Sequence, residues 1–128
     1  MGTLQDQNNQ EQCYHDEHLS VDYRHQQAVL DSRPLTLTRK EYDLLALLVQ
    51  HAGEIVPREA LLMRIWGYGA DIRTRTLDVH IRRLRKKLGT LADQYIETIF
   101  GIGYRFQPFH APRFRQPEVD RPAFAVSA

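Results

Sequence analysis

Residues 75–89 read RTLDVHIRRLRKKLG and place six lysines and arginines within fifteen positions of a chain whose net charge is only +1. At about 100° per residue, four apolar residues of this stretch lie within about 40° of one direction. They are Leu77, Ile81, Leu84 and Leu88. The stripe predicts a helix over about 74–88, with Thr74 as its N-cap and Gly89 at its end. Such a narrow stripe must pack on a core.

The opposite face of this predicted helix holds most of the positive charge. Its members are Arg75, Thr76, Val79, Arg82, Arg83 and Lys86. Solvated helix faces usually mix signs, but Asp78 is the only acidic residue in this helix. A polyanion such as DNA would bind this face, because each neutralised phosphate releases counterions. An exposed valine can contact the thymine methyl while arginine reads guanine, although a solubilising helix with one stray valine would show the same pattern.

Charge is polarised along the whole chain. Residues 1–37 carry two arginines against six acidic residues, whereas residues 38–88 carry eleven lysines and arginines against six acidic residues. A local basic surface of this kind steers a phosphate backbone even when the net charge is near zero. The 128 residues, 42% hydrophobic and 26% charged, are typical of one compact domain.

Several classes of protein and site are not expected. The longest apolar run, residues 44–49, is too short to span a membrane and no signal peptide opens the chain, so we expect a cytoplasmic protein without membrane contact. Cys13, His15 and His18 lack a fourth ligand on a fixed frame, so we expect no metal site and no cofactor. No nucleophile, base and orienting acid occur together, so we predict no catalytic residues and no enzyme activity.

Local signals predict the elements that precede the basic helix. Three short alternating runs indicate a small antiparallel sheet, and they cover residues 19–23, 28–30 and 35–37. Thr38 and Glu41 form a capping box that predicts a helix ending near Gly53. A shorter helix is expected between Pro57 and Gly67. Its inward residues should be Leu61, Leu62, Ile65 and Trp66.

A hairpin is expected after the basic helix. A polar link leads to two alternating runs, residues 95–100 and 104–107, which flank glycines. The order of strands, three helices and hairpin predicts an α+β fold, a winged helix-turn-helix with an N-terminal antiparallel sheet and a C-terminal β-hairpin wing. We expect residues 1–17 to be a disordered arm or the boundary of an excised piece, residues 18–107 to form the domain, and residues 108–128 to be a flexible, proline-containing tail.

Three motifs in this order carry a resemblance to a known family. They are REALLMRIWG (58–67), RTLDVHIRRLRKKL (75–88) and TIFGIGYRF (98–106). With them the chain resembles, over about residues 17–107, the C-terminal winged-helix DNA-binding (effector) domain of OmpR/PhoB-type two-component response regulators.

The resemblance implies a transcription regulator in a phosphorelay. Its recognition helix, about 74–88, would lie in the major groove and its wing, 95–107, on the adjacent minor groove. It further implies tandem binding to direct repeats, a contact between loop 67–73 and RNA polymerase, and, in a longer protein, a receiver domain and a sensor kinase. The alternative of a different class is a winged-helix adaptor that docks its basic helix on an acidic protein.

Carried over by position, the resemblance implies a set of DNA-contacting residues. In the helix these are Arg75, Thr76, Val79, His80, Arg82, Arg83 and Arg85, and in the wing Thr98 matches a phosphate contact. The angular argument supports the outward residues, including Lys86, independently. His80 and Arg85 lie nearer the flanks, where the angular support is weaker. His80 either contacts DNA or packs at the helix boundary.

The chain departs from the family pattern at three points. Many members carry arginine between the wing threonine and glycine, where this chain has Phe100, which we expect to pack into the hairpin base or else to contact sugar edges. Pro57 stands where members often have a serine or threonine cap, so we expect no side-chain cap there. No receiver precedes the domain, so the chain is either an excised fragment or a stand-alone member, and Met1 and Gly2 favour excision.

Overall fold

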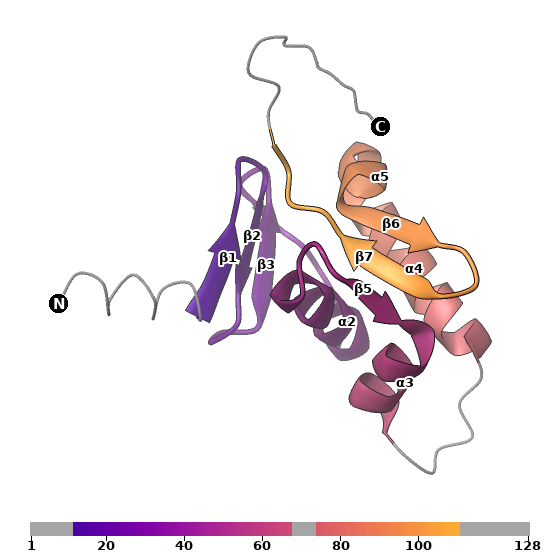
Figure 1. Cartoon of the computed structure of the whole chain (residues 1–128). Coiled ribbons are helices and arrows are strands. Elements are labelled where there is room, and N and C mark those ends of the chain that lie inside the picture. Colours follow the sequence, from indigo (N-terminus) through magenta and orange to yellow (C-terminus); the bar gives the residue numbers. More distant parts are fainter. Residues whose placement is uncertain (1–11, 68–73, 111–128) are drawn as a thin grey trace, which may run out of the picture.

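The computed structural model describes residues 12–67 and 74–110 (Figure 1). Its elements are β1 (Cys13–His15), β2 (Leu19–Asp22), β3 (Gln27–Leu30), β4 (Arg33–Pro34), α2 (Arg39–Gln50), β5 (Ile55–Pro57), α3 (Arg58–Trp66), α4 (Thr74–Leu88), η1 (Gly89–Leu91), α5 (Ala92–Tyr95), β6 (Ile96–Ile99) and β7 (Gly103–Phe106). An antiparallel sheet, helices and a terminal hairpin follow in the predicted order, so the winged-helix fold is confirmed. No helix among the described residues is long and apolar enough to cross a membrane.

The N-terminal sheet pairs β1, β2, β3 and β4 in sequential antiparallel order. Leu19 lies opposite Leu30, and Val21 lies opposite Ala28. Alternate residues of a strand face the same side of a sheet, and on this side Leu19, Val21 and Ala28 are buried in the core.

The sheet differs from the predicted one at both ends. Tyr14 in β1 pairs with Val21, so the ordered domain includes residues that we had assigned to the arm 1–17. The last strand is Arg33–Pro34 rather than 35–37. Asp31 and Ser32 both have positive φ, which makes a tight two-residue hairpin turn, and pairing therefore resumes immediately at Arg33. Residues 1–11 of the predicted arm lie outside the described part.

The capping box at the start of α2 is present as predicted. The Glu41 N–H donates to Thr38 Oγ1 at 3.2 Å, and the Thr38 N–H donates to Glu41 Oε1 at 3.0 Å. The helix ends at Gln50 with His51 as its C-cap, and Gly53, with φ +86°, lies in the turn that follows. The Gly53 N–H then donates to the Phe106 carbonyl at 2.8 Å, which links this turn to the hairpin.

A strand that the sequence analysis missed, β5, joins the hairpin just before α3. It pairs antiparallel with β7, with Pro57 opposite Gly103. A Cβ on Gly103 would lie 2.1 Å from the Val56 carbonyl oxygen, so only glycine allows this close approach. Pro57 caps α3 without a side-chain hydrogen bond, as predicted. Of the four residues expected to face inward on α3, Leu61 is fully buried, and the other three, Leu62, Ile65 and Trp66, are partly buried and pack against the core.

Helix α4 packs its predicted apolar stripe on the core, which confirms the direction in which each residue of the helix was expected to face. All four stripe residues are at most 1% exposed: Leu77, Ile81, Leu84 and Leu88. The side chain of Thr74, the predicted N-cap of α4, lies outside the described part. Residues 68–73, which belong to the loop expected to face RNA polymerase, also lie outside it.

The segment between α4 and the hairpin is helical, although we had expected a polar link. Gly89, with φ +66°, ends α4, and the chain continues through η1 and α5. Ala92 and Tyr95 of α5 are buried, and the Tyr95 ring stacks on Phe106 with 5.4 Å between centroids. Two buried side chains three residues apart are too few to give a periodic sequence signal.

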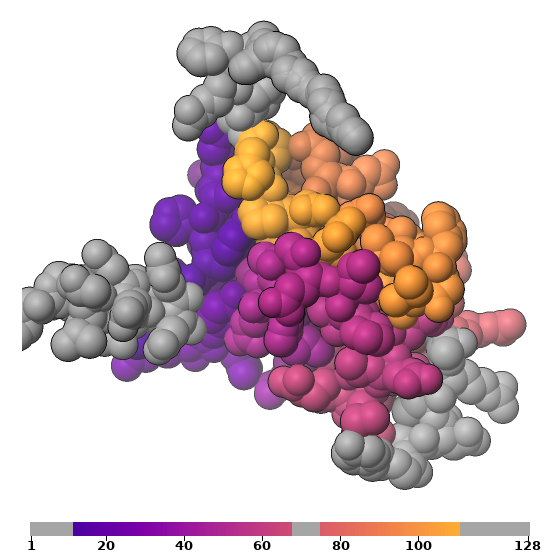
Figure 2. Space-filling model, viewed as in Figure 1, coloured from indigo at the N-terminus to yellow at the C-terminus, as the bar shows by residue number. Residues whose placement is uncertain are grey.

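Asp16 connects the N-terminal sheet to the C-terminal part of the domain. Its carboxylate accepts from the Tyr14 hydroxyl, from the Tyr95 hydroxyl at 2.7 Å and from the Phe109 N–H at 3.2 Å. The Phe109 ring also meets His18 edge-on at 4.5 Å, and Figure 2 shows the yellow end of the described chain against the indigo sheet. The domain therefore extends to Phe109, past the predicted boundary at 107, while residues 111–128 lie outside the described part.

Candidate nucleic-acid interface

The outward face of α4 is basic and exposed, as its angular pattern predicts. Its exposed cations are Arg75, Arg82, Arg83 and Lys86, and half-buried Thr76 and Val79 lie among them. Within residues 12–67 and 74–110, none of these four cations has an ion pair or a hydrogen bond. Four unpaired like charges on one face repel one another, so the pattern stabilises nothing within the domain.

Cations on the flanks of α4 and on neighbouring elements are used by the fold instead. Lys87 Nζ lies 2.5 Å from Oε1 of Glu41, whose side chain is only 2% exposed. Arg105 Nη2 lies 2.9 Å from Glu97 Oε1 within the hairpin. The domain therefore does contain acidic residues that pair with cations. The outward cations are unpaired because their side chains point away from the other elements.

One contact between α4 and the hairpin is made by Arg85. Its Nη2 donates to the Ile96 carbonyl at 2.9 Å and to Thr98 Oγ1 at 2.7 Å. The guanidinium carbon lies 5.8 Å from the centroid of the Tyr104 ring. Arg85 is thus half-buried and directed at the wing, away from the exposed cations of the helix.

The contact with Arg85 fixes which hydrogen-bonding role the Thr98 hydroxyl plays within the domain. Because its Oγ1 accepts from Arg85, its hydroxyl hydrogen is left to donate to another acceptor. The side chain is half-buried on β6, opposite Tyr104 on β7. Arg85 and Thr98, both singled out in the sequence, are therefore brought together by the fold.

A second contact between α4 and the hairpin forms around Asp78. Its Oδ1 accepts from the Tyr104 hydroxyl at 2.9 Å and lies 2.8 Å from Arg58 Nη2. Burial, and next the hydrogen bond to Asp78, raise the pKa of Tyr104, so the phenol stays a donor at neutral pH. None of these three residues was predicted to belong to the site, and the only sequence signal for them was that Asp78 is the single acidic residue of the helix.

His80 packs at the boundary between α4 and α3. Its Nδ1 lies 2.8 Å from the Thr76 carbonyl oxygen, and its ring meets Trp66 edge-on at 5.0 Å between centroids. The ring therefore joins α4 to α3. Since Nδ1 donates to the carbonyl, Nε2 is the nitrogen that can meet an external group.

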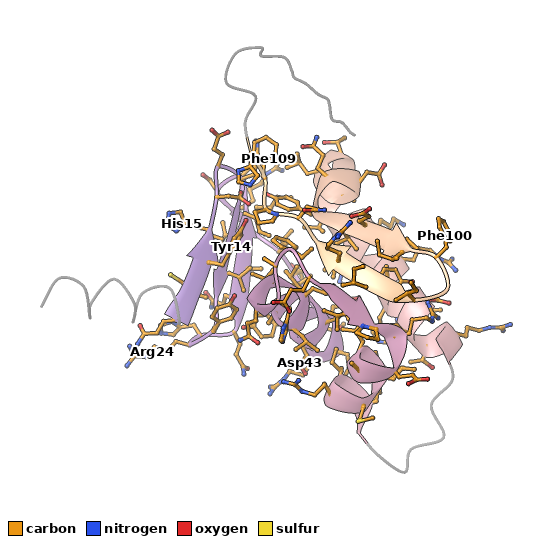
Figure 3. All side chains as sticks on the ribbon, viewed as in Figure 1. Tyr14, His15, Arg24, Asp43, Phe100 and Phe109 are labelled. Atoms are coloured by element: carbon orange, nitrogen blue, oxygen red, sulfur yellow. The ribbon has the colours of Figure 1, made fainter. Side chains whose placement is uncertain are left out.

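Phe100 contradicts our preferred expectation for the wing. Its side chain is 90% exposed, and Figure 3 shows it at the outer end of the hairpin, so it does not pack into the hairpin base. Phe100 lies in the turn that closes when the Ile102 N–H donates to the Ile99 carbonyl at 2.9 Å. A residue at such a tip has no sheet face to cover it, which is why alternation along the strands misleads here.

Residues that we had considered for metal binding do not gather. Cys13 and His15 lie in β1, whereas His18 Nδ1 lies 2.5 Å from Asp31 Oδ1 in the turn after β3. Among the residues that the structure describes, no group of three histidine, cysteine or acidic side chains is placed to hold a metal ion. The basic face of α4 and the adjoining wing are therefore the candidate site that this arrangement supports.

Comparison with known proteins places this arrangement in a family. The family "Transcriptional regulatory protein, C terminal" matches residues 32–106. The response regulator ArlR of Staphylococcus saprophyticus is 45% identical over 76 residues, which cover 59% of this chain and 34% of ArlR. This chain thus spans about a third of that relative.

Solved structures agree with the sequence match. The response regulator DrrB, described as a Thermotoga maritima OmpR/PhoB homologue, superposes with a TM-score of 0.69 and 32% identity over 75% of this chain and 44% of DrrB. The RstA DNA-binding domain of Klebsiella pneumoniae, solved in complex with the RstA box, gives a TM-score of 0.67 and 34% identity over 76% of this chain and 98% of that domain. The chain therefore belongs to the family of C-terminal domains of transcriptional regulatory proteins, in the OmpR/PhoB class of response regulators.

Proposed function

We propose that this domain binds double-stranded DNA sequence-specifically as the effector part of a transcriptional response regulator. The observation that carries the proposal is the outward face of α4, where four exposed cations lack partners among the described residues. Unpaired arginines that gain nothing within the fold gain counterion release on a phosphate backbone. The RstA domain, which has the same fold, was solved with DNA, and this supports the proposal.

In the proposed complex α4 lies in the major groove. Arg75, Arg82 and Arg83 are exposed and can contact guanine edges or phosphates, and Lys86 contacts phosphate as a point charge. Half-buried Val79, in the centre of the face, meets a thymine methyl, and Thr76 donates or accepts beside it. His80 contributes through its free Nε2 where the backbone approaches the helix flank.

The hairpin lies at the adjacent minor groove and backbone in this proposal. Thr98 donates its hydroxyl hydrogen to a phosphate oxygen, while its oxygen accepts from Arg85. Arg85 therefore acts in DNA binding chiefly as a positioning residue for Thr98, and this refines the direct contact that the family resemblance implied. Since Asp78 and Tyr104 also join α4 to the hairpin, the helix and wing meet DNA as one unit.

Further partners are proposed from the family alone. They are direct DNA repeats bound in tandem, RNA polymerase facing the loop at 67–73, a receiver domain and a sensor kinase. Because the chain spans about a third of ArlR, the receiver would be part of a longer protein. Transcriptional regulation by such a protein requires DNA binding but no catalysis by this domain.

Selection of sites from a random pool of double-stranded DNA, carried out at two salt concentrations, tests this function. We expect recovery of a direct repeat, with affinity for the recovered site that falls steeply as salt rises. A pool that stays random, together with salt-sensitive binding to an acidic protein, would contradict the proposal and support the adaptor function.

A further inference from the structure

The wing ends in an uncharged, apolar tip that the fold itself does not require. Phe100 is 90% exposed and Ile102 is 52% exposed, whereas most large apolar side chains of the described part are buried. Exposing a phenyl ring to water is unfavourable, and a solvated turn normally carries small or polar residues. Residues 99–103 carry no charge, so this tip has no side chain that could form an ion pair with a phosphate.

The turn at the tip does not explain why phenylalanine stands there. Gly101 has φ +78° and supplies the one unusual backbone conformation that the turn needs. The Ile102 carbonyl accepts from the Arg58 N–H at 2.9 Å, and this contact fixes the tip to the start of α3 through the backbone alone. Phe100 takes no part in either contact, so its side chain is free to serve another purpose.

The position of Phe100 relates the tip to the proposed DNA face. Thr98, two residues earlier, is bonded to Arg85 of α4, and Tyr104 across the hairpin is bonded to Asp78 of the same helix. These two contacts tie the hairpin to α4, and the phenyl ring projects beyond the end of the hairpin (Figure 3). In the proposed complex the hairpin lies at the minor groove, and Phe100 stands at the outer end of that hairpin (Figure 3).

We propose that Phe100 acts as an apolar wedge that inserts into the minor groove and contacts its sugar walls and base edges. Apolar side chains used in this way partly unstack a base step and widen the groove. Flexible pyrimidine–purine steps such as TA and CA yield most easily, so the ring would favour such a step at the wing position. Specificity at that position would therefore come from DNA deformability, without hydrogen bonds and without added charge. This inference rests on the proposed function, in which the hairpin lies at the minor groove.

The test compares variants at this one position on the DNA site selected with the wild-type domain. We expect Phe100→Ala to bind that site about tenfold more weakly with an unchanged salt slope, because no phosphate contact is lost. Phe100→Leu, which keeps apolar bulk, should lose less. Phe100→Arg should add about one phosphate contact and so steepen the fall of log affinity with log salt concentration. It should also shift the DNA sequence preferred under the wing toward A·T tracts with a narrow minor groove.

A matched control and a fold check keep the comparison interpretable. Met63→Ala removes another exposed apolar side chain, on α3, and should leave affinity and step preference unchanged. Thermal unfolding of Phe100→Ala should match the wild type, because the lost side chain is exposed.

Three outcomes separate this inference from the function on which it rests. Wild-type binding to a selected site that Phe100→Ala matches in affinity and step preference would overturn the wedge but not the function. If that variant instead loses self-association or binding to a protein while DNA affinity stays constant, the tip is a protein contact and the wedge is wrong. A wild-type domain that selects no DNA site would overturn both.

Discussion

Helices α2 and α4 are both amphipathic, but they use their charges in different ways. In the first turn of α2, Arg39 Nε lies 3.3 Å from Asp43 Oδ1, and Lys40 Nζ donates to the Ile65 carbonyl at 2.7 Å. Glu41 completes the capping box and binds Lys87. On the outward face of α4, by contrast, the exposed cations have no partner among the described residues.

The difference separates charges that serve the fold from charges available to a ligand. Both kinds occur on α4 itself, since Lys87 and Arg85 point toward other elements and are bonded there. Direction around the helix, rather than residue type, thus decides which cations remain free. Changes on the inward or bonded side should affect stability, and changes on the outward side should affect DNA binding.

The largest effect is expected from the core stripe of α4. Leu84→Ala removes a fully buried side chain and should lower the free energy of unfolding by about 2–5 kcal/mol. Urea denaturation followed by circular dichroism measures this change. A variant with wild-type stability would mean that the inward face of α4 is assigned wrongly.

Glu41→Gln should weaken the buried link between the two helices. It removes the charge that Lys87 meets and should lower the free energy of unfolding by about 1–3 kcal/mol at pH 7. Arg39→Gln, which alters the more exposed pair in the same turn, is the matched control and should cost less than about 1 kcal/mol. Equal stability of the two variants would show that the buried pair contributes no more than the exposed pair.

The same pair predicts a dependence of stability on pH. Burial alone would raise the pKa of Glu41, but hydrogen bonds from Lys87 and from the Thr38 N–H outweigh it and hold the pKa below its usual value. A depressed pKa in the folded state contributes stability above the unfolded value of about 4.3, and the contribution is lost as pH falls through the folded pKa. The stability difference between wild type and Glu41→Gln should therefore shrink in acid. A difference that grows below pH 4 would contradict this sign.

Arg83→Ala tests the opposite side of the comparison. The side chain is exposed and unpaired in the described part, so its loss should change the free energy of unfolding by less than about 0.5 kcal/mol. Binding to the selected DNA site should weaken by about 1–3 kcal/mol, as measured by fluorescence anisotropy. Unchanged affinity would remove Arg83 from the proposed interface.

The smallest effect is expected for Lys86→Ala. A lysine that meets phosphate as a point charge should affect all sequences about equally and reduce the salt slope by about one. Titrations of a selected and a scrambled duplex at several salt concentrations measure both quantities. If the loss is confined to the selected duplex, Lys86 reads a base rather than the backbone.

Local signals in the sequence were sufficient to predict helices α2 and α4. They were insufficient to predict the strand pairing and the side-chain contacts that join one element to another. The capping box of Thr38 and the four-residue stripe of α4 are encoded within one helix each, and both predictions are confirmed. Strand β5 was missed because three residues acquire strand character only by pairing with β7.

The wing shows the same limit within the candidate site. Arg85 could be assigned to the helix from sequence, but its bond to Thr98 spans two elements and depends on how the hairpin packs. Phe100 was expected to pack because hydrophobic residues usually do, whereas the tip of a turn offers it no surface. The part of the site that lies on one helix face was therefore predictable, and the part that depends on contacts between elements was not.

The central claim, that the direction of a cation on α4 decides its role, is tested most directly by one paired measurement. The double variant Arg82→Gln/Arg83→Gln is compared with Lys87→Gln in both unfolding free energy and the salt dependence of binding to the selected site. We predict that the double variant loses about two units of salt slope at wild-type stability, whereas Lys87→Gln loses stability at wild-type slope. Equal slopes in wild type and the double variant, or a larger loss of slope for Lys87→Gln, would contradict the account.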